Sequence, residues 1–314
     1  MVFYRTLMKD LYYKRSRMMN GFNKKVNLYL CLLAFFFIKL WNTLLWFILH
    51  KKAIVLNVFM VQEGLSIRHK NFGDDLNYYL VKALTGKYIF NYNSFFHPSI
   101  NNYVCIGSIV EDMTNEKSII WGGGVMNNEY NRFIKPLNVT AVRGPLTKAY
   151  LGKQGVQSPN VFGDPALLVS SIYKPKVSKN YSIGIIPHVS ELNNPLIIDF
   201  INKTPGAVLI DLMHYKKWTE ILDLIYQCKM IASSSLHGLI LSDAYNIPNV
   251  WICLDKKTGG GEFKFMDYFG GVNRECIQYR VNDCLDYNVI QDYCLKYKGI
   301  TFKSKELMDA CPFL

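Results

Sequence analysis

Three serines and a histidine stand close together in the stretch SSSLHGLILSDAYNIPNVW, which runs from Ser233 to Trp251. An apolar run precedes them and a helix-forming run follows. The hydroxyls and free backbone N–H groups would therefore lie at a helix N-terminus, where anions bind. The positive end of the helix dipole disfavours an imidazolium at His237, and a bound anion would reverse this effect and make the histidine an acid. The alternative interpretation is a serine N-cap followed by a surface histidine.

Arg143 is the second candidate for chemistry. It directly follows the apolar run VTAV, and Pro145 suits the first turn of a helix behind it. A guanidinium beside a helix N-terminus suits a carboxylate or a phosphate. The alternative is a structural ion pair with a nearby acid such as Asp164.

Other polar residues and glycines also follow apolar runs. In NFGDD, Asp74 and Asp75 either act on a ligand or complement the dipole of their helix. The glycines at 122–124 would let backbone amides approach a ligand, although a tight turn uses the same residues. The remaining residues of this kind are Asn71, Gly73, Gly163, Asp164 and His188. The chain has no GxGxxG motif and no Walker lysine, so a dinucleotide or nucleotide-hydrolysing site is not supported.

Parallel strands are the elements that would bring these side chains together. Short apolar runs predict strands at 53–61, 103–107, 118–124, 139–144, 181–189, 207–212, 228–233 and 249–254. Helical patterns between them predict helices at 71–86, 192–203, 216–228 and 236–246. This alternation is typical of an α/β fold whose parallel sheets are covered on both faces.

The chain divides into three predicted parts. Residues 1–52 form a basic arm and a hydrophobic helix, residues 53–175 an N-terminal Rossmann-like lobe, and residues 176–314 a C-terminal Rossmann-like lobe. The boundary between the lobes falls in the basic, proline-containing stretch 173–180. Ligands bind at the carboxyl ends of strands in such sheets, so the site is expected in a cleft between the lobes.

The net charge of +12 is concentrated at the N-terminus, because residues 1–25 carry seven basic residues and one acid. The remainder lacks a basic stripe with interleaved aromatic residues, so we predict no nucleic-acid partner. The eight cysteines form no CxxC pair, and no histidine spacing suits zinc, so we predict no metal site.

Residues 26–50 are about long enough to cross a bilayer, which needs roughly 20 apolar residues. Lys39, Asn42, Thr43 and His50 fall near one face, however, so a helix lying in the membrane interface is favoured over a spanning helix. The alternative is a buried helix that packs on the following domain. No small-residue cleavage site follows the apolar run, so a cleaved signal peptide is not expected.

The motifs NFGDDLN, WGGG, AVRGPLT, GDPALL, PH, SSSLHGLILSDAYNIP and KFMDYF occur together in this order. Over roughly residues 53–275 the chain thereby resembles the polysaccharide pyruvyl transferase family. The resemblance implies two Rossmann-like lobes arranged as in GT-B glycosyltransferases. It also implies transfer of pyruvate from phosphoenolpyruvate onto two hydroxyls of a sugar as a cyclic ketal, without a cofactor.

The resemblance also assigns roles to residues. It implies that His237, Arg143 and Asp74 are catalytic, with the histidine as general acid. The predicted substrate-binding residues are Asn71, Gly73, Gly123, Gly124, Asp164, His188, Ser234, Ser235 and Gly238. One departure is Ser235, because many members carry a basic residue directly before Leu-His. Donor binding would then depend more on Arg143 and on backbone amides, or the donor would differ.

Two other functions remain open at this stage. A GT-B-type glycosyltransferase using a nucleotide sugar would share the architecture, and Glu262 and Lys264 in GGGEFKF would suit its nucleotide diphosphate. A non-catalytic glycan-assembly scaffold would keep the fold and explain Ser235. The expected partners are phosphoenolpyruvate, a glycan acceptor that a lipid can carry, and a membrane surface. The expected location is the cytoplasmic face of the inner membrane, as a peripheral or monotopic protein.

Overall fold

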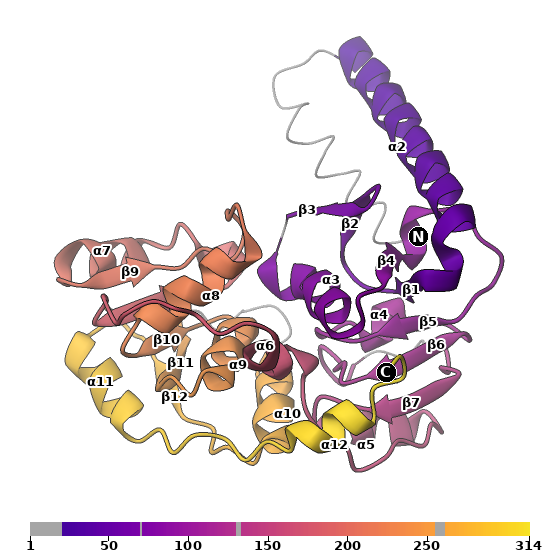
Figure 1. Ribbon diagram of the computed structural model, residues 1–314. Helices are drawn as coiled ribbons and strands as arrows, with labels where there is room; N and C mark the ends of the chain where they lie inside the picture. The colour runs from indigo at the N-terminus through magenta and orange to yellow at the C-terminus, as the bar shows by residue number, and fades with distance from the viewer. Residues whose placement is uncertain (1–20, 70, 130–132, 255–260) are drawn as a thin grey trace.

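The computed structural model describes residues 21–69, 71–129, 133–254 and 261–314. Residues 1–20, which hold most of the predicted basic arm, lie outside them. The described chain forms two lobes, each built on a five-stranded parallel sheet, with a long N-terminal helix that projects from the first lobe (Figure 1). The predicted α/β class is confirmed. The arrangement of a GT-B fold stays a prediction.

The N-terminal sheet has the strand order β4-β1-β5-β6-β7. Its strands are β1 (Ala53–Leu56), β4 (Tyr88–Asn91), β5 (Asn102–Val104), β6 (Ser118–Trp121) and β7 (Asn138–Ala141). The helices that follow them are α3 (Phe72–Thr85), α4 (Val110–Met113), α5 (Pro145–Lys153) and α6 (Val169–Ile172). The strands are short and almost continuously apolar because helices cover the sheet, which leaves no strand face for polar residues.

The C-terminal sheet has the order β12-β11-β10-β8-β9 and is also parallel throughout. Its strands are β8 (Ile183–Ile186), β9 (Ala207–Leu209), β10 (Ile231–Ser233), β11 (Asn249–Cys253) and β12 (Gln278–Arg280). Its helices are α7 (Pro195–Lys203), α8 (Trp218–Gln227), α9 (Leu236–Ala244), α10 (Phe263–Gly271) and α11 (Tyr287–Leu295). All eight predicted strands and all four predicted helices have a counterpart in the structure, with shorter strands.

Three features differ from the sequence prediction. The edge strands β4 and β12 were not expected, because YIFN and QYR are too short to show a period. The predicted strand at 53–61 ends at Leu56, and Val61 begins the antiparallel hairpin of β2 (Val61–Glu63) and β3 (Ser66–Arg68). In addition, α12 (Ser304–Asp309), which belongs to the predicted C-terminal lobe, packs on the N-terminal lobe, while the predicted division of the chain at 175/176 stays a prediction. There the indole N–H of Trp121 donates to the carbonyl of Leu307 (2.9 Å).

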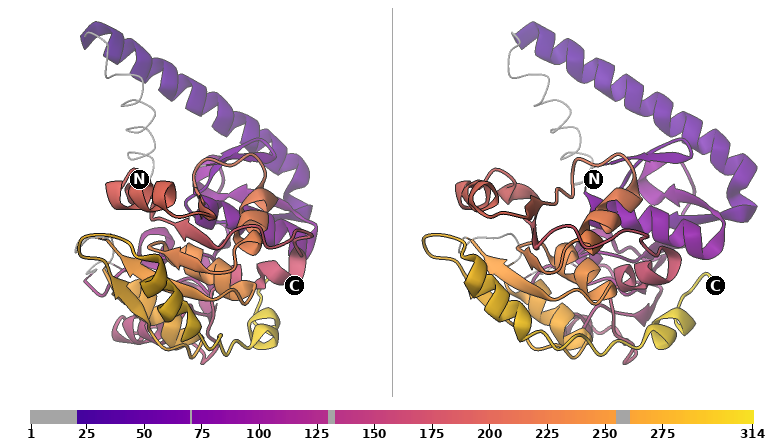
Figure 2. Two further views of the ribbon diagram at one scale, coloured as in Figure 1. Left: turned by 90° about the vertical axis from the view of Figure 1, so that its left-hand side faces the viewer. Right: turned by 60° about the vertical axis from the view of Figure 1, so that its left-hand side comes forward.

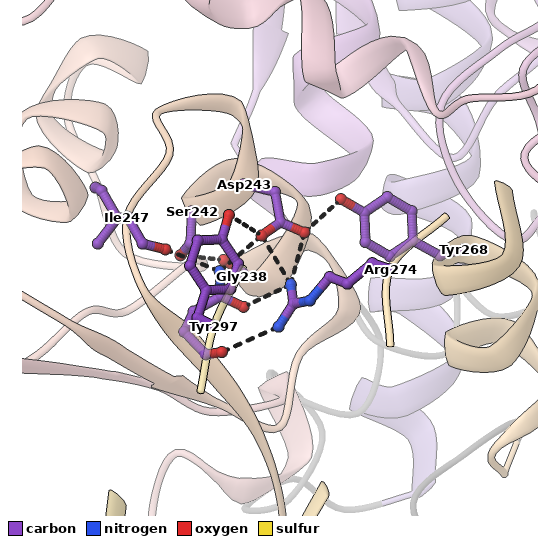
Figure 3. A network of polar contacts seen from close by, with 8 residues as sticks. Gly238, Ser242, Asp243, Ile247, Tyr268, Arg274 and Tyr297 are labelled. Carbon is purple, nitrogen blue, oxygen red and sulfur yellow. Dashed lines mark hydrogen bonds and ion pairs between the residues drawn. The ribbon is translucent and has the colours of Figure 1, made fainter. Parts of the chain in front are cut away.

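A buried polar network joins the third strand-helix unit of the C-terminal lobe, β10 and α9, to α10 (Figure 3). The carboxylate of Asp243, at the end of α9, accepts hydrogen bonds from the Arg274 guanidinium (2.7 Å), Tyr268 (2.7 Å) and Tyr297 (2.9 Å). Asn249 donates to the same carboxylate at 2.7 Å. Because the polar atoms of these side chains are hydrogen-bonded to one another, the network holds α9 in a fixed position relative to α10.

The long helix α2 (Gly21–Leu49) leads through the short 3-10 helix η1 (His50–Lys52) into β1. Its C-terminal half packs on the N-terminal lobe, where Trp46 lies 4.9 Å from Phe95 and 5.4 Å from Phe90 between ring centroids. Its N-terminal half extends away from the body of the molecule, as all three views show (Figure 2). One 21-residue segment, Leu32–Lys52, is long and apolar enough to cross a membrane.

Candidate active site

The start of α9 carries the serines and the histidine that the sequence singled out. The Ser233 hydroxyl lies 2.8 Å from the carbonyl oxygens of both Ile186 and Ser235, to either of which its one proton can be donated, and it accepts from the Ser235 N–H at 3.0 Å. Ser235 occupies the N-cap position, but its hydroxyl makes no capping bond. The alternative of a serine side-chain cap is therefore wrong. The helix N-terminus keeps its capacity to bind an anion.

His237 reaches from the C-terminal lobe to the N-terminus of α3 in the other lobe. A Cβ built on Gly73 would lie 2.0 Å from the imidazole Nδ1, so the ring rests directly against this glycine. The Nε2 atom is buried and has no hydrogen-bond partner among the described residues. A buried nitrogen without a partner is costly in an apoprotein and is typical of a site that a ligand completes.

Asp74 lies one residue beyond Gly73, beside this contact. Asn71 caps α3, accepting from the Gly73 N–H at 3.3 Å and donating to Asp74 Oδ2 at 3.1 Å. Burial, followed by the neighbouring charge of Asp75, raises the pKa of Asp74 to about 7. A carboxyl group with this pKa can take up a proton from a substrate hydroxyl near neutral pH.

Arg143 is fully buried and pairs with an acid, but the acid is not Asp164. Its Nε donates to Asp267 Oδ2 at 3.0 Å, and Asp267 also accepts from the N–H and the hydroxyl of Thr147 (2.8 and 2.6 Å). Its other bonds go to the Ser108 hydroxyl and to the carbonyl of Val125. Three of the five guanidinium N–H groups are thus used within the protein, and the other two could serve only a ligand that reaches this fully buried side chain.

Asp164, a predicted substrate-binding residue, has a structural role in this geometry. It is fully buried and caps the 3-10 helix η3 (Pro165–Leu168), accepting from the Ala166 N–H at 2.9 Å. Burial raises its pKa to about 6.

In WGGG, Gly124 makes room for the arginine, whereas substrate binding by Gly123 stays a prediction. A Cβ on Gly124 would lie 2.1 Å from the Arg143 Cζ, so only glycine lets the guanidinium lie here. The Gly124 N–H donates to the carbonyl of Gly107 at 2.9 Å, and the Gly123 carbonyl accepts from the Arg143 N–H at 3.1 Å. The expectation that the Gly124 amide is free for a ligand is therefore wrong.

Lys264, on the first turn of α10, is a site residue to which the sequence analysis gave no role in pyruvyl transfer. It is only 6% exposed, and burial followed by the charge of Arg143 lowers its pKa to about 8. Its charge in turn lowers the pKa of both His237 and His188, so it lies within reach of both rings. The signal was available, because Lys264 and Asp267 both belong to the motif KFMDYF.

His188, Ser234 and Gly238 complete the set on the C-terminal lobe. The His188 N–H donates to the Ser234 hydroxyl at 2.9 Å, and that hydroxyl donates to Glu191. The two residues follow the adjacent parallel strands β8 and β10, as the sequence predicted. Gly238 instead faces its own sheet, because a Cβ there would lie 2.2 Å from the Ser233 hydroxyl. A contact between Gly238 and a substrate is not supported by this geometry.

The electrostatics of the site favour an anion. Burial, then the charge of Arg143 and then that of Lys264 lower the pKa of His237 to about 3, so the ring is neutral without a ligand. A dianion between these cations would offset their effect and raise the pKa of the histidine. No group of three or more metal-ligating side chains lies together in the described parts of the chain.

The fold and site define an α/β protein in which polar and charged side chains from two parallel-sheet lobes lie close together. A family model for polysaccharide pyruvyl transferase matches residues 71–253, more than half of the chain. The protein belongs to this family and is a transferase.

Two curated relatives are similar to the chain. One is the uncharacterized protein L143 of Acanthamoeba polyphaga mimivirus, 26% identical over 247 residues, which cover 74% of this chain and 78% of the relative. The other is the succinoglycan biosynthesis protein ExoV of Rhizobium meliloti (strain 1021), 28% identical over 205 residues, which cover 64% of this chain and 61% of that protein. No solved structure matches significantly.

Proposed function

We propose that the protein transfers pyruvate from phosphoenolpyruvate onto two hydroxyls of a glycan as a ketal, in the synthesis of an exopolysaccharide. The carrying observation is that His237 from one lobe lies against Gly73 and beside Asp74 of the other, within the field of Arg143 and Lys264. An acid, a base and two cations in one place match the needs of this reaction.

Phosphoenolpyruvate carries a carboxylate and a phosphate, and the site has three elements for them. They are the two remaining N–H groups of Arg143, the ammonium of Lys264, and the N-terminus of α9. Lys264 supplies the positive charge that many family members place directly before Leu-His, where this chain has Ser235. The departure at Ser235 is therefore compatible with the same donor.

The donor converts His237 from a neutral ring into a general acid. Protonation of the methylene carbon by the imidazolium leaves a cation-like carbon, to which the oxygen of the first sugar hydroxyl bonds while Asp74 takes its proton. The bond from this carbon to the phosphate oxygen then breaks and inorganic phosphate leaves. The second hydroxyl attacks the same carbon and closes the ketal, and its proton passes to solvent or to His237.

Labelled donors test this function directly. Incubation of the protein with a glycan extract of the source organism should move label from [14C]phosphoenolpyruvate into glycan, with release of phosphate. His237→Asn should abolish this transfer and leave the melting temperature close to that of wild type. Transfer of label from nucleotide sugars, with none from phosphoenolpyruvate, would instead support the glycosyltransferase alternative.

We further propose that residues 26–50 attach the protein to the cytoplasmic face of a membrane, where phosphoenolpyruvate is available. On α2 the side chains of Phe37 and Phe47 are 62% and 68% exposed. Large apolar side chains exposed next to one another in this way are typical of a surface that contacts a membrane or a partner. Phe37→Glu should release the protein from phosphatidylglycerol-containing vesicles in a flotation assay, whereas Ile198→Glu on the exposed face of α7 should not. Equal flotation of the two variants would contradict the attachment.

A further inference from the structure

Helix α2 packs on its own protein with its polar residues. Asn42 is completely buried, donating to the Ser94 carbonyl and accepting from the Gly64 N–H, both at 2.9 Å. The Thr43 hydroxyl accepts from the Phe96 N–H at 2.9 Å. The apolar side chains of Leu45, Trp46 and Leu49 pack on the lobe as well. A helix on a water-soluble domain usually buries mainly its apolar face, so the buried polar contacts of α2, combined with an uncovered apolar surface, are unusual.

The surface that α2 leaves uncovered between Tyr29 and Ile48 is largely apolar among the described side chains. The exposed residues are Tyr29, Leu30, Leu32, Leu33, Phe36, Phe37, Leu40, Trp41, Leu44, Phe47 and Ile48, each at least 41% exposed. Only 11% of the most apolar part of the segment Leu32–Lys52 is buried inside the protein. Phe96 of the lobe, 43% exposed, continues this surface at 5.9 Å from the Phe36 ring.

The packing removes the reason for expecting an interfacial helix. That expectation depended on a polar face at Lys39, Asn42 and Thr43, and the lobe now satisfies Asn42 and Thr43. Residues 28–38 read LYLCLLAFFFI, with no polar face to lie toward water. An in-plane helix needs such a face, whereas a helix that is apolar all round inserts into the hydrocarbon. From Val26 to Trp41 the helix measures about 24 Å at about 1.5 Å per residue, most of the roughly 30 Å hydrocarbon thickness.

The direction of the helix relative to the site follows from the strand directions. Leu49 leads into the start of β1, whereas Asn42 binds Ser94, which follows the end of β4. Since β1 and β4 are parallel, α2 runs antiparallel to them. Its N-terminal half therefore leaves the lobe on the carboxyl side of the sheet, the edge from which the site residues come.

We infer that α2 inserts into a lipid bilayer and, through its buried polar contacts, holds the carboxyl edge of the N-terminal sheet toward the membrane, so that the site receives a glycan attached to a lipid. The placement of a lipid-attached glycan at the site rests on the proposed function, whereas the insertion and orientation of α2 do not. Lys39, whose ammonium lies 4.7 Å over the Phe96 ring, is at the level where the helix leaves the lobe. A cation suits the anionic headgroups at that depth.

Two dye positions test the orientation without any need for the acceptor. An azide-bearing residue replaces either Ser66, in the hairpin beyond the carboxyl edge, or Lys117, in the turn that precedes β6 at the amino edge, and is coupled to a donor dye. Both positions are exposed. The labelled proteins bind phosphatidylcholine vesicles that contain phosphatidylglycerol and an acceptor dye on the headgroup. Energy transfer should be strong from position 66 and weak from position 117.

Equal transfer from the two positions would mean that α2 lies flat on the membrane, and stronger transfer from 117 would mean the opposite orientation; either result overturns the inference. A stable dimer that binds no vesicles would do the same, because a second copy would then cover the helix. Trp41 and Trp46 provide an internal check, because Trp46 packs on Phe95. Quenching by brominated lipid should disappear in Trp41→Phe and persist in Trp46→Phe. Since His237→Asn should leave all these readouts unchanged, failure of the catalytic proposal is separable from failure of this one.

Discussion

At the scale of single residues, the neutral state of His237 is the property on which the proposed reaction depends. The ring is held near two cations without a hydrogen bond at Nε2 from the described residues. Its pKa of about 3 lies below the ordinary value of 6.5. Between these values the unfolded chain binds a proton that the folded one does not, so this residue lowers stability as pH falls through that window. The neutral His237 therefore lowers the free energy of unfolding at acid pH, and the same lowered pKa allows an anion to change its protonation.

Proton uptake on anion binding follows from this arrangement. Sulfoacetate, whose carboxylate and sulfonate do not titrate near neutral pH, should bind at pH 6.5 with uptake of up to about one proton, because its charge offsets the cations that depress the pKa of His237. Calorimetry in two buffers with different protonation enthalpies measures this uptake. His237→Asn should remove it. Binding without any difference between the two proteins would show that another group responds.

The contact between Gly73 and His237 allows a test of site geometry. Gly73→Ala would place a methyl group 2.0 Å from the present position of Nδ1, so the ring must move. Displacement of a catalytic group by about 1 Å can cost on the order of 100-fold in rate, and we expect a loss of that size in kcat. Gly152→Ala on α5 is the matched control, since no atom lies within 4 Å of its new Cβ. Its kcat should stay within twofold of wild type, and an equal loss in both variants would contradict the assigned geometry.

Much of the candidate site could be predicted from residue types and order, but its internal pairing could not. His237 and Arg143 were found because each follows an apolar run that forms a strand, and Asp74 because it stands in the first turn of a predicted helix. The Arg143–Asp267 pair joins residues 124 positions apart, and a single sequence holds no local pattern for such a contact. The motif KFMDYF marked Lys264, but its place beside Arg143 depends on how α10 packs against α5 and could not be read from the motif.

At the scale of elements, the network around Asp243 holds the two helices that carry His237 and Lys264. Asp243 is 4% exposed and Arg274 is 8% exposed, so both charges depend on each other and on the tyrosines. Arg274→Leu would leave the carboxylate buried without its cation, which typically costs about 3–5 kcal/mol of unfolding free energy. Urea denaturation measures the loss.

Arg280→Leu is the control for this element-scale prediction. Arg280 pairs with Glu262 through side chains that are 61% and 56% exposed, and such surface pairs contribute about 0–1 kcal/mol. The two variants remove the same charge from the same lobe and differ in burial. Similar unfolding midpoints for both would show that the network around Asp243 does not hold the helices together.

At the scale of the whole molecule, the sequence predicted two α/β units but not how the chain joins them. Alternating apolar and helical runs were sufficient for the elements, because periodicity is a local property. The return of the last residues to the first lobe was not predictable in this way. Nothing in the run SKELMDACPFL distinguishes a surface helix of the second lobe from a segment that packs on the first.

Phe313 shows how the chain fastens the two lobes. The chain reaches Phe313 after it has left the C-terminal sheet. The Phe313 ring packs edge-to-face on Trp121 of β6 and on Tyr103 of β5, at centroid distances of 5.3 and 5.2 Å. Phe313→Ala should lower the free energy of unfolding by about 3 kcal/mol, near the lower end for large aromatic side chains since the ring is 9% exposed.

Leu314→Ala, at a neighbouring side chain that is 64% exposed, should change the free energy of unfolding by less than about 0.5 kcal/mol. Thermal unfolding of both variants, followed by circular dichroism, separates the two cases. If Phe313 fastens the lobes, its loss should also lower the affinity for sulfoacetate, because His237 and Asp74 come from different lobes and need a fixed separation. Destabilisation with unchanged affinity would show that Phe313 supports the first lobe alone and that Arg143, Asp267 and α10 set the distance across the site.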